Sequence, residues 1–231
     1  MSKDTFFSEK MKLADLIIEH PNLLFLLPRF GIALGFGDHN VAEVCRQYGI
    51  SPACFLLICK VYSDDNFLPH RNDLYAVNMK DLFSYLRTSH RYYLETRIPN
   101  IERLLTAVVR SCQARYGNML QRFFEDYKTE VIHHFDYEEK TVFPYIEQLI
   151  GNKHPKDFSI DQFKHNHSNV EDTLSDLMNI VIKYLPADID QENRIAISLA
   201  IIELSNDLNR HTLIEDRVLI PYVELLENAR P

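Results

Sequence analysis

The chain has 231 residues, of which 25 are Lys or Arg and 33 are Asp or Glu, so its formal net charge at pH 7 is −8. An acidic chain is a poor match for a polyanion, which argues against nucleic acid or an anionic membrane surface as a partner. With 6 glycines, the chain has fewer turn residues than an average globular protein, and this favours long helices.

The apolar runs of the chain are short. The longest uncharged ones, Leu23–Pro28 and Cys54–Cys59, fall well below the length that a membrane-spanning helix needs. The N-terminus lacks a positive region followed by an apolar stretch and a small-residue cleavage site, so we expect a cytoplasmic protein. The four cysteines contain no CxxC pair, and we expect them to be reduced and mostly buried.

Residues 1–65 have the pattern of a small module of short helices. Pro21 is expected to open one helix, Asp38 to cap a second that Gly49 closes, and Ser51 to begin a third. The composition turns polar between Ser63 and Tyr75, which is typical of a linker. We therefore expect a helical module at 1–65, a linker at 66–77 and a main domain at 78–231.

Four long segments follow, with apolar residues at the three- and four-residue spacing of amphipathic helices. They cover residues 79–116, 119–150, 159–186 and 192–228. Gly117 and Gly151 mark two of the breaks, and short loops between such helices predict an all-α protein built on an antiparallel four-helix bundle. Pro99, Pro144 and Pro221 lie inside the segments, and we expect a kink or a helix end at each.

The second of these helices is repeated in the fourth. Residues 134–147 match residues 211–224 position by position at a shift of 77, and the same shift carries His90 onto His167. Each half therefore contains one His followed 44 residues later by His-x-x-x-Glu. A lone His-x-x-x-Glu is an ordinary surface salt-bridge spacing. Two copies in register, with two further histidines, point to a shared site.

The repeat places six polar side chains in the core of the predicted bundle. In each half, the His and Glu of the motif lie one helical turn apart on nearly the same face, and the remaining His comes from the neighbouring helix. The predicted metal ligands are His90, His134, Glu138, His167, His211 and Glu215. Burying two carboxylates without a counter-charge is costly. Nitrogen and oxygen ligation suits iron, manganese or zinc, and six ligands exceed what one zinc needs, so two metals are favoured, with iron first.

The alternative to a metal centre is a duplicated helical pair whose histidines and charges are solvated. Four neighbours of the predicted ligands point elsewhere around their helices, so we expect them on the surface or behind the ligands. These neighbours are His133, His165, Glu139 and Asp216.

This pattern resembles the hemerythrin-like di-iron domain, in particular that of the iron–sulfur cluster repair proteins. The residues that carry the resemblance are His90, His134-x-x-x-Glu138-Glu139 with Pro144, His167, and His211-x-x-x-Glu215 with Pro221. The resemblance covers residues 78–228. It implies a non-haem di-iron centre with an oxo or hydroxo bridge between the ions, in which the four histidines hold the two irons and the two glutamates bridge them.

Residues 11–64 resemble the small helical domain that precedes the di-iron domain in the repair proteins. One feature departs from that family, because its adjacent cysteine pair falls here at Gly35-Phe36. The thiols Cys45, Cys54 and Cys59 lie nearby in sequence, but Cys54-x-x-x-x-Cys59 is not a preferred metal spacing. A role as iron donor would therefore rest on the di-iron centre alone.

The resemblance implies a protein that supports repair of iron–sulfur clusters damaged by oxidative or nitrosative stress, by donating iron or by handling nitric oxide or oxygen. A reversible oxygen- or nitric-oxide-binding protein or sensor is the alternative. A third hypothesis is an enzyme that reduces peroxide or nitric oxide at the centre. The implied partners are a diatomic gas and damaged iron–sulfur proteins, and the sequence leaves a homodimer open.

Overall fold

The computed structural model describes residues 7–151, 153, 155, 158–166, 170–187 and 190–228. Over these ranges the chain is helical and contains no β-strand, which confirms the all-α prediction. No helix in the described part is long and apolar enough to cross a membrane. The chain forms two compact units, one of Met1–Ser89 with Leu213–Pro231 and the other of His90–Thr212. The three-part division expected from the sequence remains a prediction.

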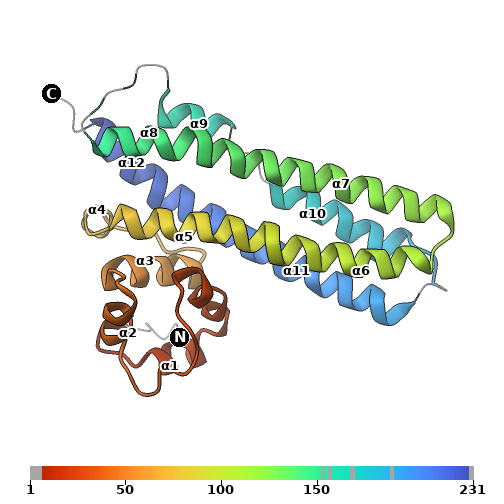
Figure 1. Ribbon diagram of the computed structural model, residues 1–231, viewed down its shortest axis with the longest axis horizontal. Helices are drawn as coiled ribbons and strands as arrows, with labels where there is room; N and C mark the ends of the chain where they lie inside the picture. The colour runs from red at the N-terminus through yellow and green to blue at the C-terminus, as the bar shows by residue number, and fades with distance from the viewer. Residues whose placement is uncertain are drawn as a thin grey trace. The chain divides into compact units, whose positions relative to one another are not determined.

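Short helices occupy the first part of the chain (Figure 1). They are α1 (Leu13–Glu19), η1 (Pro21–Phe25), η2 (Leu27–Phe30), α2 (Val41–Tyr48), α3 (Pro52–Ser63) and α4 (Arg71–Tyr75). Pro21 opens η1, Gly49 closes α2 with a φ of 68°, and the Ser51 hydroxyl caps α3 by accepting the Cys54 amide. These three expectations are confirmed.

The cap of α2 differs from the expected one. Asn40, not Asp38, precedes the helix, and its side chain accepts the Glu43 amide at 2.9 Å. The Glu43 carboxylate in turn accepts the Asn40 amide at 2.9 Å. This reciprocal pair satisfies two backbone donors at once, which a single Asp cap would not do. Asp38 instead forms an exposed ion pair with Lys12.

The polar stretch after α3 is only partly non-helical. Residues 64–70 contain no helix, but Arg71–Tyr75 forms α4. The Asp73 carboxylate accepts the His70 amide at 2.8 Å, and this local cap stabilises a turn within a segment whose composition predicted a linker. Arg217 donates to the backbone carbonyls of Asp65 at 2.5 Å and Phe67 at 2.9 Å, so the non-helical stretch is held in place by a side chain distant in sequence.

The long helices are interrupted but otherwise follow the predicted segments. Their bounds are α5 (Met79–Tyr92), η3 (Tyr93–Arg97), α6 (Ile98–Arg110), α7 (Ala114–Tyr137), η4 (Glu138–Val142), α8 (Phe143–Ile150), α9 (Ile160–Asn166), α10 (Val170–Asn179), η5 (Ile180–Tyr184), α11 (Gln191–Ile214), η6 (Glu215–Leu219) and α12 (Ile220–Asn228). In the unit His90–Thr212, α6, α7, α10 and α11 lie alongside one another (Figure 1) and share one apolar core.

The first break between long helices lies earlier than predicted. α6 ends at Arg110 and α7 begins at Ala114, so Gly117 lies inside α7 and does not stop a helix. A Cβ at Gly117 would lie 2.9 Å from Cγ1 of Val109, closer than carbon atoms pack. The glycine therefore permits close approach of α7 to α6. The prediction that Gly117 ends a helix is wrong, because it treated this glycine as a turn residue.

Each of the three prolines inside the long segments is separated by one residue from the end of a short π-helix, which confirms the expected interruptions. Pro99, Pro144 and Pro221 are the second residues of α6, α8 and α12, after η3, η4 and η6. The residue before each proline donates its amide to the carbonyl five positions back, as Phe143 does to Glu138. Because proline has no amide hydrogen and crowds the preceding turn, a wider turn accommodates it.

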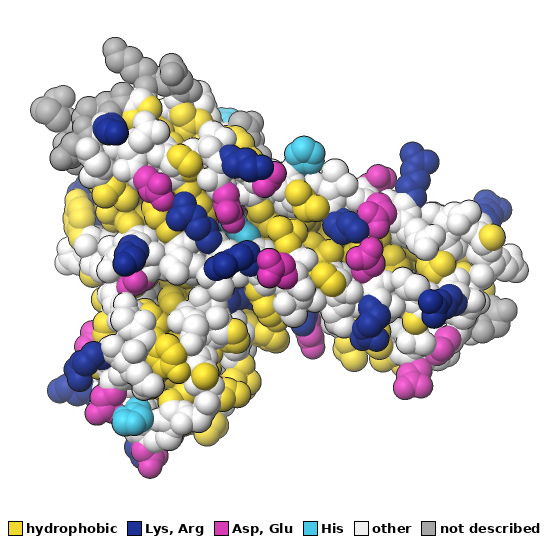
Figure 2. All heavy atoms as spheres, viewed as in Figure 1, with side chains coloured by type: hydrophobic (Ala, Val, Ile, Leu, Met, Phe, Trp, Pro, Cys, Tyr) yellow, Lys and Arg dark blue, Asp and Glu magenta, His cyan; other side chains and the backbone are white. Residues whose placement is uncertain are grey.

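Acidic and basic side chains are interspersed on the face of the molecule drawn in Figure 2. Acidic and basic side chains of the described residues also form ion pairs, as Lys140 does with Asp136 at 2.6 Å and Arg97 with Glu203 at 2.9 Å. Such exposed pairs contribute little to stability individually.

Candidate metal centre

The predicted ligands that the structure describes come from the ends of three long helices. His90 lies in the last turn of α5, His134 in the last turn of α7, and His211 in the last turn of α11. The two glutamates follow one turn after their histidines: Glu138 opens η4 and Glu215 opens η6. His167 lies outside the described residues, so its position stays a prediction.

These side chains are buried, although they are polar. His90 and His211 are 1 % exposed, His134 is 9 % exposed, and Glu138 and Glu215 are fully buried. Charged groups are rarely buried to this extent unless they are paired or bind a metal. The alternative of solvated histidines and carboxylates is therefore wrong for these five residues.

The Glu138 carboxylate lies between two imidazoles. Its Oε1 is 2.8 Å from Nε2 of His134, and its Oε2 is 3.0 Å from Nε2 of His90. The same Nε2 of His90 lies 3.2 Å from Nε2 of His211. Each oxygen of one carboxylate thus faces a different histidine.

Four of the residues bring potential ligand atoms to one place. His90, Glu138, His211 and Glu215 each offer one such atom, and these atoms all lie within 4.8 Å of one another. Two imidazole nitrogens and two carboxylate oxygens form a donor set that suits a divalent transition metal. A cation here would also offset the cost of burying the carboxylates. The residues present therefore fit a metal ion.

Aromatic rings enclose the His90 side chain. The Phe135 ring stacks on the imidazole at a centroid distance of 4.2 Å and an interplanar angle of 11°, and the Phe143 ring lies parallel at 5.9 Å. Tyr93, which is fully buried, meets His211 edge-on at 5.6 Å. These rings exclude water and limit rotation of the imidazoles, so the ligand atoms are held in place before any ion binds.

Three of the four neighbouring residues lie on the surface, as expected: His133, His165 and Asp216 are exposed. Glu139 is different in detail. Its side chain is 37 % exposed, and its Oε1 lies 2.8 Å from Nδ1 of His90. The sequence predicts Glu139 on the surface or behind the ligands, but nothing in its position along the chain identifies His90 as its contact.

Among the described residues, no cysteine belongs to a cluster of potential metal ligands. All four are free thiols; Cys45, Cys54 and Cys59 are buried and Cys112 is partly exposed, as expected. Burial raises the pKa of the Cys45 and Cys54 thiols to about 12 and that of Cys59 well above its usual value. Protonated thiols are poor metal ligands and poor nucleophiles.

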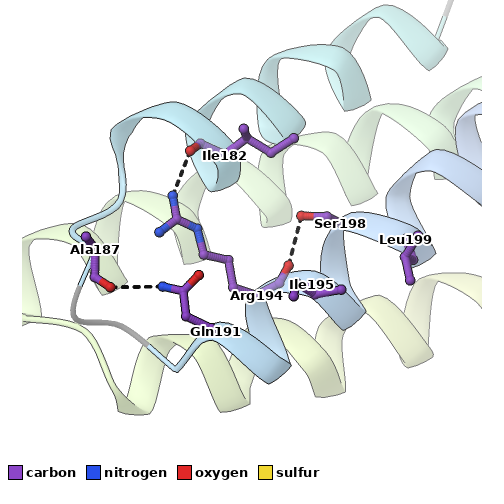
Figure 3. Close-up of a pocket in the computed structure, with 7 residues that line it drawn as sticks. All are labelled: Ile182, Ala187, Gln191, Arg194, Ile195, Ser198 and Leu199. Atoms are coloured by element: carbon purple, nitrogen blue, oxygen red, sulfur yellow. Dashed lines mark hydrogen bonds between the residues drawn. The ribbon is translucent and has the colours of Figure 1, made fainter.

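A surface pocket of about 570 Å³ lies at the other end of α11, and Figure 3 shows Arg194 there donating to the carbonyl of Ile182 at 2.7 Å. Arg194 also donates to the carbonyls of Val181 at 2.7 Å and Pro186 at 3.2 Å. Arg194 precedes His211 by 17 residues, or about 25 Å along an α-helix. The pocket is therefore separate from the ligand cluster. Because the Arg194 guanidinium donates to three backbone carbonyls, we assign it a role in stabilising the fold.

An all-helical chain with a buried cluster of imidazoles and carboxylates belongs to the class of helical cation-binding proteins. Residues 81–223 match the model of the hemerythrin HHE cation binding domain. Because this match covers more than half of the chain, the protein belongs to the hemerythrin HHE family. No curated protein and no solved structure matches the chain.

Proposed function

We propose that this protein is a non-haem di-iron protein whose four-helix bundle holds two irons between the two halves of the repeat. The proposed ligands are His90, His134, Glu138, His167, His211 and Glu215. The single observation that carries the proposal is the convergence of four buried potential ligand atoms within 4.8 Å of one another. Membership of a cation-binding family supports the same conclusion.

The geometry of Glu138 supports two ions. A carboxylate whose Oε1 faces His134 at 2.8 Å and whose Oε2 faces His90 at 3.0 Å can bridge two neighbouring cations. The repeat supports the same division of ligands, since a shift of 77 residues carries His90 onto His167 and His134 onto His211. His90 and His211, which lie together, are therefore the counterparts of His167 and His134.

Iron is the proposed metal because the donor set combines imidazole and carboxylate without thiolate. When bound, a pair of irons supplies a change between ferrous and ferric states and a coordination position for a diatomic gas. The protein supplies the remaining conditions. The histidines fix the ions, the glutamates balance their charge, and Phe135 and Phe143 keep water away from His90.

We propose that the centre supports repair of iron–sulfur clusters damaged by oxidative or nitrosative stress, either by releasing iron or by handling nitric oxide or oxygen. The support is the resemblance of residues 11–64 to the small domain of the repair proteins. In this chain the thiols Cys45, Cys54 and Cys59 are buried and protonated at neutral pH. Any iron that is donated would therefore come from the His and Glu ligands.

The test of the metal centre is the metal content of full-length protein purified without added metal, together with its optical spectrum. We expect about two irons per chain and absorption from a bridged iron pair. A protein that retains zinc alone, or no metal after reconstitution with ferrous iron, would contradict the di-iron proposal.

The role is tested separately with the iron-loaded protein. In the repair role, adding it to an enzyme whose iron–sulfur cluster has been damaged by nitric oxide restores activity, and a variant without iron does not. Reversible spectral change on exposure to oxygen or nitric oxide, with all iron retained and no recovery of the damaged enzyme, would instead establish a gas-binding protein. Sustained turnover of peroxide or nitric oxide with a reductant would establish an enzyme.

A further inference from the structure

The imidazole of His90 is contacted by two parallel aromatic rings and at both ring nitrogens. Phe135 and Phe143 lie parallel to the ring at 4.2 and 5.9 Å. At one edge, Nε2 faces Oε2 of Glu138 at 3.0 Å, and at the other edge, Nδ1 faces Oε1 of Glu139 at 2.8 Å. Two consecutive glutamates thus reach the two nitrogens of one ring.

We propose that Glu139 is a positioning residue that accepts a hydrogen bond from Nδ1 of His90 and so holds the ring with Nε2 towards the cation. The inference rests on the proposed metal-binding function. A carboxylate can only accept a hydrogen bond, so Nδ1 donates to Glu139. Without a cation, Nε2 faces the Glu138 carboxylate in the same way, and a bound cation would take the place of any hydrogen on Nε2. In metal sites, a carboxylate on the outer nitrogen of a ligating histidine fixes the ring and makes it a stronger donor to the metal.

The local backbone explains how Glu139 reaches the ring. Glu138–Val142 is a π-helix, and the amide of Phe143 bonds to the carbonyl of Glu138 across five residues. Consecutive residues in such a wide turn are separated by a smaller angle than in an α-helix. Glu138 and Glu139 therefore point towards the same histidine, although an α-helical projection places Glu139 well to one side.

Glu138 and Glu139 differ in burial, and this difference indicates different roles. The Glu138 side chain is fully buried next to Nε2 of His90, which is the nitrogen that also faces His211 at 3.2 Å. The Glu139 side chain is 37 % exposed and approaches the opposite nitrogen. Glu139 is therefore placed to orient a ligand, while Glu138 is placed to be one.

The experiment compares wild type with Glu139→Ala, Glu139→Gln and the control Asp136→Asn in the full-length chain. Asp136 is also a carboxylate on this stretch, but it pairs with Lys140 and does not lie at the cluster. The first measurement uses protein without metal: nitrogen-15 NMR of the histidine rings reports whether Nδ1 of His90 carries a hydrogen. The second follows the rate at which iron-loaded protein loses ferrous iron to a chelator.

In wild type we expect His90 to carry hydrogen on Nδ1. Glu139→Ala should give a mixture of tautomers and release iron about 10- to 100-fold faster, the usual effect of losing an outer carboxylate. Glu139→Gln should retain the tautomer, because its amide oxygen still accepts, and should release iron at an intermediate rate. Asp136→Asn should behave as wild type.

The two proposals fail in different ways. If Glu139→Ala keeps both the wild-type tautomer and the wild-type release rate, or if Asp136→Asn changes them equally, the role of Glu139 is overturned while the metal centre stands. If wild type binds no iron, the proposed function is overturned, and the NMR comparison still decides whether Glu139 fixes the His90 ring.

Discussion

The Nε2 atoms of His90 and His211 lie 3.2 Å apart, although 121 residues separate them in the chain. Both imidazoles are 1 % exposed, so water does not solvate these nitrogens. Two nitrogen lone pairs at this distance repel unless a proton or a cation lies between them. His90, His211 and the residues that contact them are therefore the positions at which mutations test the metal centre most directly.

Replacing Glu138 with Leu should remove most of the bound iron. The substitution deletes the carboxylate that lies between His90 and His134 and puts an apolar side chain of similar size in a fully buried position. Without metal, the variant should be at least as stable as wild type, because a buried charge has been removed. Metal analysis and thermal unfolding of the metal-free protein measure the two effects.

The matched control for that change is Glu147→Gln, which alters an exposed glutamate on the next helical stretch. It should retain the iron content of wild type. A Glu138→Leu protein that is folded and carries its full iron complement would remove Glu138 from the ligand set.

Variants of the paired histidines should not be additive. His90→Ala and His211→Ala remove ligands that lie together, so each should lower the occupancy of the same ion, and the double variant should lose little more than either alone. Combining His90→Ala with His134→Ala should instead affect both ions. Metal stoichiometry for the three single and two double variants measures this, and equal losses in both double variants would contradict the assignment.

Gly117→Ala should destabilise the protein by about 1–2 kcal/mol, the cost of overpacking less the gain in helix propensity. The added Cβ would lie 2.9 Å from Cγ1 of Val109. Val109→Ala in the same chain should recover part of the loss, since it removes the clashing methyl groups. Gly151→Ala meets only ordinary contacts of 3.5 Å and serves as the control. Denaturant unfolding measures all four proteins.

The buried thiols should resist modification in the folded protein. Burial raises the pKa of Cys45 and Cys54 to about 12, so below that pH these groups are predominantly thiols and not the reactive thiolates. A thiol reagent at pH 8 should label Cys112, which is partly exposed, and should reach all four cysteines only in denaturant. Rapid labelling of Cys54 in folded protein would show that the thiol is accessible and its pKa lower.

Arg194→Ala should lower the free energy of unfolding by about 1–3 kcal/mol, because the guanidinium satisfies two backbone carbonyls within η5 and that of Pro186 just after it. Arg194→Lys retains one charged donor and should recover part of the loss. Since this residue is remote from the ligand cluster, both variants should bind metal as wild type does. A change in metal stoichiometry without a change in stability would contradict the structural role given to Arg194.

The ligand cluster was predictable because its residues recur at regular spacings in the sequence. A His and a Glu four residues apart must share a helical face, and the repeat at a shift of 77 residues identified which of many such pairs mattered. Glu139 was less predictable: its contact with His90 depends on the π-helix at Glu138–Val142, and a regular α-helical projection places it elsewhere.

The ends of helices were predictable where a residue acts locally. Gly49 and Ser51 terminate and begin helices through their own backbone and hydroxyl groups. The role of Gly117 was not predictable, because it depends on a contact with Val109 on a neighbouring helix. The sequence alone does not distinguish a glycine in a turn from a glycine that allows two helices to pack closely. Asn40 displaced Asp38 as the cap of α2 because only Asn40 is spaced to exchange bonds with Glu43.

The π-helices also restrict how the chain can change in length. A π-turn holds about one residue more than an α-turn, so deleting Lys140, Thr141 or Val142 would let that turn revert to regular α-helix and would remove the wide turn that brings Glu139 to His90. Deleting one residue within α7, ahead of His134, would instead rotate every downstream side chain by about 100° relative to the preceding part of the helix. Natural variation in length should therefore be avoided at η4, where it would remove the contact of Glu139 with His90, as well as in the turns before His134.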